Sequence, residues 1–163
     1  MQEHNWERLK AEHSINNPIA RMRVKGKSKG KEIRNLPNCF KQDSNIESVL
    51  NICREAKVQL MGKNFEPDWG LFNGSIGIVK EIVFNKDENP LDGTLLQYVI
   101  VEFPDYCGPP WIPNKPKCVP IPPVELYCQS HCCSVQFIPL ALAYAKTGHT
   151  FQGQSAGPEL TIP

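Results

Sequence analysis

The sequence predicts a mainly β protein built around a small, closed or partly open β-barrel. Five short apolar runs bounded by turn residues lie between residues 56 and 145, and such runs are typical of strands. The chain also has 15 prolines in 163 residues, about 9% against a usual share of about 5%, which favours extended and irregular backbone. Together these observations exclude a mainly helical bundle.

The first expected element is a basic, loosely structured segment at residues 1–45. Residues 1–34 hold nine Lys/Arg and four Asp/Glu, a net charge of +5, whereas residues 35–163 have a net charge of −4. The basic residues concentrated here are Arg21, Arg23, Lys25, Lys27, Lys29, Lys31 and Arg34. Two interpretations stay open: a solvated mobile arm or hairpin, or a strip that contacts phosphates with a steep dependence on salt.

A helix is expected at residues 46–55, followed by the barrel at 56–136. The apolar runs that predict strands are 56–61, 75–84, 95–103, 118–126 and 137–145. Asn73-Gly74 stands just before the second run, and both residues of this tight-turn dipeptide tolerate positive φ. The dipeptide therefore predicts a turn that leads into a strand.

A proline-rich loop is expected at residues 104–123, where eight prolines prevent pairing as a central strand. We expect this stretch to run extended across the surface. It is either a rigid loop that crosses the barrel or a binding segment for aromatic-lined grooves.

Several features restrict the compartment and the chemistry. Residues 1–10 are too charged for a signal peptide, and the longest uncharged run, 126–145, is too polar to span a membrane. Gly26-Lys27-Ser28 is not a phosphate loop, because the pattern G-x-x-x-x-G-K-[ST] requires a glycine where Arg21 stands. We therefore expect a soluble, intracellular protein with no membrane partner and no phosphate loop.

The cysteines suggest a zinc site as one interpretation. Seven cysteines, an odd number, favour reduced thiols or a metal site over a disulfide framework. Zinc takes four thiolate or imidazole ligands, and C-x-x-H or C-x-x-x-C spacing supplies a pair. The candidate ligands are Cys107, Cys118, Cys128, His131 and Cys132, with Cys133 beside them. The other interpretation is a set of small buried or loop thiols.

The segment that carries most functional information is Pro139–Pro158, PLALAYAKTGHTFQGQSAGP. An apolar strand runs into a group of polar residues and a glycine: Lys146, Thr147, His149, Gln152 and Gly153. Open α/β sheets place ligand groups at such strand ends. The spacing T-x-H-x-x-Q-G can aim a hydroxyl and an imidazole at a phosphate backbone. On this chemistry alone, a polar loop after a core strand stays an open alternative.

Residues 140–154 resemble motif V of superfamily-one helicases of the RecD-like and Pif-type group, in which an alanine-rich strand leads into T-[aliphatic]-H-x-x-Q-G. Residues 56–84 are similar to the segment of those helicases that opens a small SH3-like barrel inserted in the second, RecA-like motor domain. In that segment Asn73, Gly74 and Gly77 match the barrel turn, L-x-N-G-x-x-G-x-V. The resemblance covers residues 50–157, and helicases of Helitron-like mobile elements are similar.

The resemblance implies a mainly β fold with α/β flanks, with residues 137–163 as a strand and motif V of an incomplete motor domain. Thr147 and His149 would contact the tracked single-stranded DNA, and Lys146 would add a phosphate contact. The residues implied to lie toward the ATP phosphates, at the interface of the motor domains, are Gln152 and Gly153. Stacking of bases is an alternative to burial for the aromatic residues Trp69, Phe72 and Trp111.

The resemblance also implies cofactors and partners. The full-length helicase would use ATP and Mg²⁺, act on single-stranded DNA in the nucleus, and contain the remaining motor-domain segments. Phosphoryl transfer needs a phosphate cradle, an acidic Mg²⁺ ligand and an arginine; the chain shows neither of the first two and ends at Pro163, before the arginine-bearing motif. We therefore expect a helicase fragment that needs no cofactor alone and hydrolyses no ATP. The alternatives are a stand-alone nucleic-acid-binding module and a protein-interaction module that uses the proline-rich loop or a zinc-stabilised knuckle.

Overall fold

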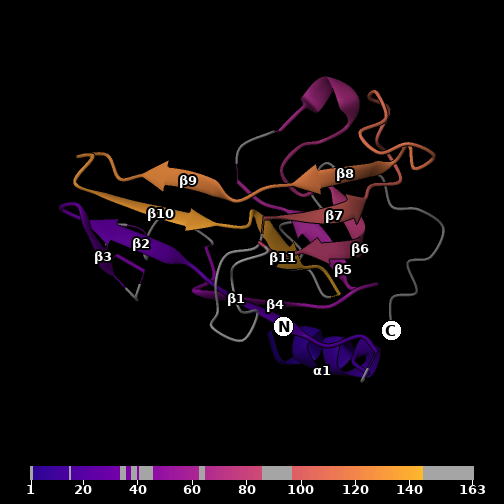
Figure 1. The fold of residues 1–163 in the computed structure, drawn as a ribbon, viewed down its shortest axis with the longest axis horizontal. Coiled ribbons are helices and arrows are strands. Elements are labelled where there is room, and N and C mark those ends of the chain that lie inside the picture. The colour runs from indigo at the N-terminus through magenta and orange to yellow at the C-terminus, as the bar shows by residue number, and fades with distance from the viewer. Residues whose placement is uncertain are drawn as a thin grey trace, which may run out of the picture.

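A computed structural model describes residues 2–14, 16–33, 36–37, 40, 46–62, 65–85 and 97–144. This part of the chain is mostly β, with one α-helix and strands that pair into three antiparallel sheets (Figure 1). The predicted mainly β class is therefore confirmed. Residues 145–163, which carry the predicted motif V, lie outside the described residues.

The two-stranded sheet corrects the helix expected at residues 46–55. β4 (Val49–Ile52) pairs antiparallel with β1 (Ala20–Arg23), so the predicted helix is wrong. Leu50 and Ile52 are buried while Val49 and Asn51 are half-buried, and this period of two is the pattern of a strand. The segment also contains two β-branched residues, which favours extended backbone.

α1 (Gln2–Glu12) occupies the segment expected to be loosely structured. Leu9 is fully buried and belongs to the same apolar cluster as Met22 of β1. The side-chain amide of Asn5 donates to the carbonyl oxygen of Leu142, 3.4 Å away. The helix therefore packs beside β11 (Leu140–Leu142). The expectation that residues 1–45 are loosely structured is wrong for the part of this range that the structure describes.

The basic segment forms half of a four-stranded sheet. The strand order is β3-β2-β10-β9, with every neighbour antiparallel. The strands are β2 (Lys25–Ser28), β3 (Lys31–Ile33), β9 (Val124–Tyr127) and β10 (Cys133–Phe137). β9 and β10, which we assigned to the barrel at 56–136, thus pair with each other and with the N-terminal basic segment.

The remaining apolar runs form a five-stranded antiparallel sheet in the order β11-β5-β6-β7-β8 (Figure 1). Its strands are β5 (Lys57–Leu60), β6 (Ile76–Val83), β7 (Tyr98–Glu102), β8 (Cys118–Ile121) and β11 (Leu140–Leu142). A short 3₁₀ helix, η1 (Pro67–Trp69), precedes the turn into β6. The strand expected at 118–126 is two strands, β8 and β9, because Pro122 and Pro123 between them have no N–H to donate.

Asn73 and Gly74 form the predicted turn. The carbonyl oxygen of Phe72 accepts the N–H of Ser75 at 3.0 Å. Gly74 has φ of 94°, whereas Asn73 is not among the described residues with positive φ. Positive φ at the second central position alone is the signature of a type II turn.

Gly77 lies inside β6 rather than in the turn, so its assignment as a turn residue is wrong. It stands opposite Val58 of β5. A Cβ atom on Gly77 would lie 2.5 Å from Val101 Cγ1 and 2.7 Å from the carbonyl oxygen of Glu102. Glycine is therefore required here by the close approach of β7 to β6.

The proline-rich loop is shorter than expected. Residues 118–121 of the predicted loop 104–123 form β8, in which Pro120 stands opposite Ile100 of β7. β8 is an edge strand of its sheet. Proline is tolerated at an edge because its nitrogen needs no partner there.

Two apolar clusters hold the sheets together. The larger contains the most deeply buried residues of the five-stranded sheet, including Val58, Leu60, Val79, Val101 and Phe103. The smaller contains Val24, Val135 and Phe137 of the four-stranded sheet region together with Cys128 and Cys133. Within the described ranges, no helix is long and apolar enough to cross a membrane.

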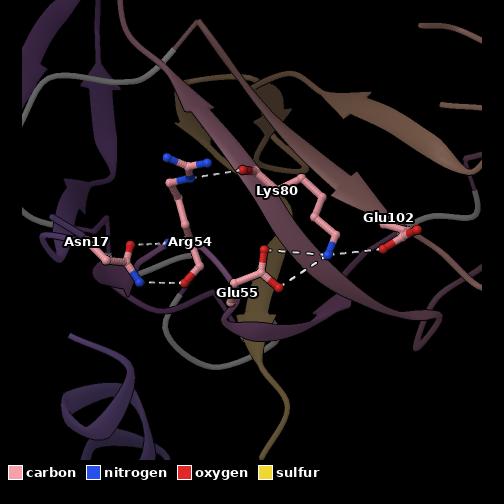
Figure 2. Close-up of polar contacts among 5 residues, drawn as sticks. All are labelled: Asn17, Arg54, Glu55, Lys80 and Glu102. Atoms are coloured by element: carbon pink, nitrogen blue, oxygen red, sulfur yellow. Dashed lines mark hydrogen bonds and ion pairs between the residues drawn. The ribbon is translucent and has the colours of Figure 1, made fainter. Parts of the chain in front are cut away.

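A polar network ties the β4–β5 connection to β6 and β7. Figure 2 shows Lys80 between Glu55 and Glu102, with its Nζ 3.2 Å from a carboxylate oxygen of each. Arg54 Nε donates to the carbonyl oxygen of Lys80 at 3.3 Å, and Asn17 makes two 2.9 Å hydrogen bonds with the backbone of Arg54. Hydrogen bonds to Glu102 and Glu55 raise the pKa of Lys80.

Candidate nucleic-acid interface

An exposed row of basic side chains, which we call the basic row, runs along β1 and β2. Arg21, Arg23, Lys25 and Lys27 are exposed, and the residues between them are buried. Successive side chains of a strand point to opposite faces, so these four share one side at intervals of about 6.6 Å. The basic row therefore presents positive charge along a line, an arrangement that suits the phosphates of an extended nucleic-acid strand.

The hairpin between β2 and β3 adds two more exposed lysines. Lys29 and Gly30 form its loop with φ of 49° and 77°, the doubly positive combination of a type I′ turn. Lys31 follows on β3 and is exposed. Glu32 stands directly opposite Lys27, so the positive potential is reduced at that pair.

Glu125 is a second carboxylate near the basic row, and two hydrogen bonds fix it. Ser134 Oγ donates to Glu125 Oε1 at 2.8 Å, and the hydroxyl of Tyr127 donates to Glu125 Oε2 at 3.0 Å. These bonds, Ser134 first, lower the pKa of Glu125, with a smaller contribution from the charge of Lys27. The ionised carboxylate in turn raises the pKa of Tyr127 and holds its hydroxyl as a donor.

Tyr127 presents an aromatic ring on the same face as Lys27. In the sheet register Tyr127 stands opposite Ser134, which stands opposite Lys27. The Tyr127 residue is 57% exposed, and its ring centroid lies 5.9 Å from that of His131. An exposed aromatic ring next to aligned cations is the combination that binds single-stranded nucleic acids by stacking and phosphate contact.

The aromatic residues singled out in the sequence lie elsewhere. Phe72, in the turn before β6, is 43% exposed, and Trp111, in the loop before β8, is 55% exposed. Trp69 is half-buried and packs against the larger apolar cluster. The structure thus leaves Phe72 and Trp111 open to solvent and favours a packing role for Trp69.

The turn between β9 and β10 gathers three cysteines, which we call the thiol cluster. The Sγ atoms of Cys128, Cys132 and Cys133 lie within 4.8 Å of one another. The hydroxyl of Ser130 lies 3.4 Å from Cys128 Sγ, and the N–H of Cys133 donates to that sulfur at 3.3 Å. Hydrogen bonds, that of Ser130 first, lower the pKa of the Cys128 thiol to about 5 and so favour its thiolate form.

Only two of the five expected zinc ligands, Cys128 and Cys132, belong to the thiol cluster. Cys107 is exposed and lies 3.7 Å from the carbonyl oxygen of Asp68. Cys118 is buried in β8 of the other sheet, and burial raises the pKa of its thiol. No disulfide joins the six cysteines that the structure describes.

Sequence reasoning missed Tyr127 as a surface aromatic, and it noted Cys133 beside the candidate zinc ligands without counting it among them. Tyr127 is the last residue of β9, in which half-buried and exposed residues alternate. This alternation places Tyr127 on the exposed face of the strand. Cys133 falls outside C-x-x-x-C spacing, but the turn before it contains His131 with φ of 53°, and this left-handed residue redirects the chain. The signals were strand alternation and turn geometry rather than ligand spacing.

The predicted motif V lies after β11 in the sequence, and the structure describes the position of β11. β11 pairs with β5 through Leu140 opposite Leu60 and Leu142 opposite Val58. Thr147, His149, Lys146, Gln152 and Gly153 lie outside the described residues, so their roles stay predictions.

Solved structures with a similar fold are Pif1 helicases. A Pif1 helicase from Candida albicans gives a TM-score of 0.63 at 22% identity and covers 94% of this chain and 35% of that chain. A Pif1 from Bacteroides bound to single-stranded DNA gives 0.60 at 16% identity, with 95% and 30% covered. A structure of two coordinating Pif1 helicases at forked DNA gives 0.61 at 17% identity, with 93% and 28% covered.

The comparisons establish the fold of the chain. No protein-family model and no curated protein matches it. The chain spans 28% to 35% of the length of these three solved helicases. This chain therefore has the fold of a segment of the Pif1 helicases.

Proposed function

We propose that this chain is a segment of an ATP-dependent DNA helicase of superfamily one, in the RecD-like and Pif-type group, and that it supplies contacts to single-stranded DNA. The observation that carries the proposal is the fold match with Pif1 helicases over 93–95% of the chain, one of them bound to single-stranded DNA. In this proposal β5, β6, β7 and β8 of the five-stranded sheet correspond to the SH3-like barrel inserted in the second motor domain, and β11 corresponds to the motor-domain strand that precedes motif V.

The segment after β11 couples the binding of single-stranded DNA to the binding of ATP. Thr147 and His149 contact the single strand, and Lys146 adds a phosphate contact. The residues that face the phosphates of ATP, bound with Mg²⁺ in the complete helicase, are Gln152 and Gly153. β11 gives this segment a fixed start, because it pairs with β5 and accepts the hydrogen bond of Asn5.

The basic row and Tyr127 supply a second contact with the strand. The basic side chains follow one another at regular intervals along an extended backbone, so each can neutralise one phosphate. Tyr127 stands two strands away from Lys27 on the same face, and it is exposed to solvent, where a base can stack on its ring. Glu125 and Glu32 lower the charge of this face, which keeps the contact reversible.

The chain alone hydrolyses no ATP in this proposal. The sequence has no phosphate loop, and without such a cradle the transferred phosphoryl group is neither positioned nor neutralised. Other segments of the helicase supply these groups. DNA-stimulated ATP hydrolysis above background by the purified chain would contradict this part of the proposal.

Binding of a fluorescently labelled single-stranded oligonucleotide, measured by anisotropy at several salt concentrations, tests the DNA contact. The variant Lys25→Ala/Lys27→Ala removes two members of the basic row. Since each phosphate contact contributes about 0.7 to the slope of log affinity against log salt, the slope should fall by about 1.4. The control Lys57→Ala/Lys115→Ala removes the same charge from exposed positions in and beside the five-stranded sheet and should leave the slope unchanged.

His149→Ala should weaken binding if motif V takes part in it, and this result fits both a helicase segment and a stand-alone nucleic-acid-binding module. Only the adjoining coding sequence separates these two functions. The coding sequence upstream should contain an in-frame G-x-x-x-x-G-K-[ST], and an arginine-bearing motif should follow downstream. Stop codons on both sides would remove the helicase assignment and leave the binding module.

A further inference from the structure

The sulfur atoms of the thiol cluster have the separations of a metal centre. Cys128 Sγ lies 3.6 Å from Cys132 Sγ, and Cys132 Sγ lies 3.9 Å from Cys133 Sγ. In a tetrahedral zinc site with Zn–S bonds of about 2.3 Å, neighbouring sulfurs lie about 3.8 Å apart. The backbone of the β9–β10 turn therefore already brings the three sulfurs close to the distances that one ion requires.

Hydrogen bonds around the cluster hold these sulfurs in place. Ser130 Oγ lies 3.2 Å from Cys132 Sγ and 3.4 Å from Cys128 Sγ, so its one hydroxyl proton serves either sulfur, and the backbone N–H of Cys133 donates to Cys128 Sγ at 3.3 Å. The backbone of the turn is closed by two more bonds, from Cys128 N–H to Cys133 O at 3.0 Å and from His131 N–H to Cys128 O at 2.9 Å. Donors of this kind orient metal ligands and favour the thiolate form.

We propose that Cys128, Cys132 and Cys133 bind one Zn²⁺ ion, with water as the fourth ligand. Thiolates are soft ligands, which select zinc over Mg²⁺ or Ca²⁺. Cys132 is exposed, so the ion and its water reach the site from solvent, whereas Cys128 and Cys133 are buried. Each thiol that is still protonated releases its proton to solvent as the ion binds, and no electron is transferred.

A disulfide is the competing use of two of these thiols. A disulfide bond is about 2.05 Å long, whereas Cys132 Sγ lies 3.6 Å from Cys128 Sγ and 3.9 Å from Cys133 Sγ. A disulfide would also leave the third sulfur unused, whereas zinc uses all three. His131 is not assigned as a ligand, because its ring lies beside that of Tyr127.

The ion would fix one end of the four-stranded sheet. The carbonyl oxygen of Cys132 accepts the N–H of Lys29 at 2.9 Å, which joins the thiol cluster to the β2–β3 loop. Both turns lie at the same end of the sheet (Figure 1). Zinc is thus expected to order the end of the sheet that carries Lys29 and Tyr127, and the site itself does not depend on the proposed DNA contact.

The test uses the full chain, purified under reducing conditions, incubated with excess ZnCl₂ and freed of unbound metal by gel filtration. Elemental analysis should give about one zinc per chain. Cys132→Ser should reduce this to below about 0.2; Cys132 is exposed, so this variant should keep the wild-type circular dichroism spectrum. Cys107→Ser, an exposed cysteine outside the cluster, and His131→Ala should keep the wild-type zinc content.

Cobalt substitution gives a second readout that does not depend on stability. Co²⁺ bound by thiolates absorbs through sulfur-to-metal charge transfer, and this band should be lost in Cys132→Ser and kept in Cys107→Ser. Wild-type chain that retains less than about 0.2 zinc overturns the proposal. Zinc retained in folded Cys132→Ser, or lost in His131→Ala or Cys107→Ser, overturns the assigned ligand set.

Discussion

Replacing Gly77 by alanine tests the packing of β6 against β7. The added Cβ would lie 2.5 Å from Val101 Cγ1, 2.7 Å from the carbonyl oxygen of Glu102 and 3.0 Å from Phe103 Cδ1. Optimal contacts between carbon atoms are about 3.5–4.0 Å, so atoms must shift by close to 1 Å. The carbonyl belongs to β7, which is paired with strands on both sides and cannot move alone.

The expected destabilisation follows from two opposing effects. One extra methyl in a packed site costs about 1–3 kcal/mol, and contact with backbone places Gly77→Ala in the upper part of that range, about 2–3 kcal/mol. Alanine also restricts the unfolded chain, which offsets about 0.4–1 kcal/mol. The net loss is about 1–2.5 kcal/mol, or a fall in Tm of about 2–10 °C for a chain of this size.

Urea denaturation followed by circular dichroism measures this loss. Val101→Ala removes one of the clashing atoms, so Gly77→Ala should cost less in that background than in the wild type. A loss below about 0.5 kcal/mol in the wild-type background would refute the packing argument. An equal cost in both backgrounds would show that Val101 plays no part.

Three further predictions concern polar contacts. Lys80→Ala removes two partly exposed ion pairs and should lower the free energy of unfolding by about 0.5–1 kcal/mol in urea denaturation; an unchanged free energy of unfolding would contradict this prediction. Because its partners raise the pKa of Lys80, this contribution should be complete below the ordinary lysine pKa, about 10.4, and vanish as pH rises through the raised value. The wild type and Lys80→Ala should therefore converge at alkaline pH, and a constant difference speaks against the pairs. Ser134→Ala removes the main hydrogen bond that lowers the pKa of Glu125, so carboxyl NMR titration should show that pKa rising toward 4.5. An unchanged pKa would show that another group causes the shift.

The sequence predicted the five-stranded sheet well because its strands are short apolar runs separated by clear breaks. Asn73-Gly74 marked the turn before β6, and the runs at 56–61, 75–84 and 95–103 became β5, β6 and β7. Gly77 was placed in the correct segment of the sequence, but it was wrongly explained as a turn residue. Its need for glycine comes from Val101 across the sheet, and such a contact is invisible in local sequence.

The N-terminal half was harder to predict because two signals compete there. Its many lysines and arginines suggested a mobile arm, yet buried Met22 and Val24 alternate with them, and the segment forms β1 and β2. At Val49–Ile52 a run of four apolar and polar residues is too short to separate helical from extended periodicity, and pairing with β1 decides the outcome.

The candidate site depends on tertiary structure more than the fold does. Cys128 and Cys132 were identified as candidate zinc ligands by their spacing. Cys118 could be excluded as a ligand only from the structure, because β8 belongs to the five-stranded sheet. Tyr127 joins Lys27 because β10 lies between their strands, a pairing of residues about 100 positions apart. Residues that act together across a sheet leave no pattern of spacing in the chain.

The most direct single measurement is the affinity of the purified chain for a labelled single-stranded oligonucleotide across a series of salt concentrations. We expect saturable binding whose log affinity falls against log salt with a slope of about −2 to −3, as contact of the four basic side chains with phosphates requires. The slope should become shallower in Lys25→Ala/Lys27→Ala and stay unchanged in Lys57→Ala/Lys115→Ala. Absence of binding, or binding that does not change with salt, would contradict a role for this chain in holding single-stranded DNA.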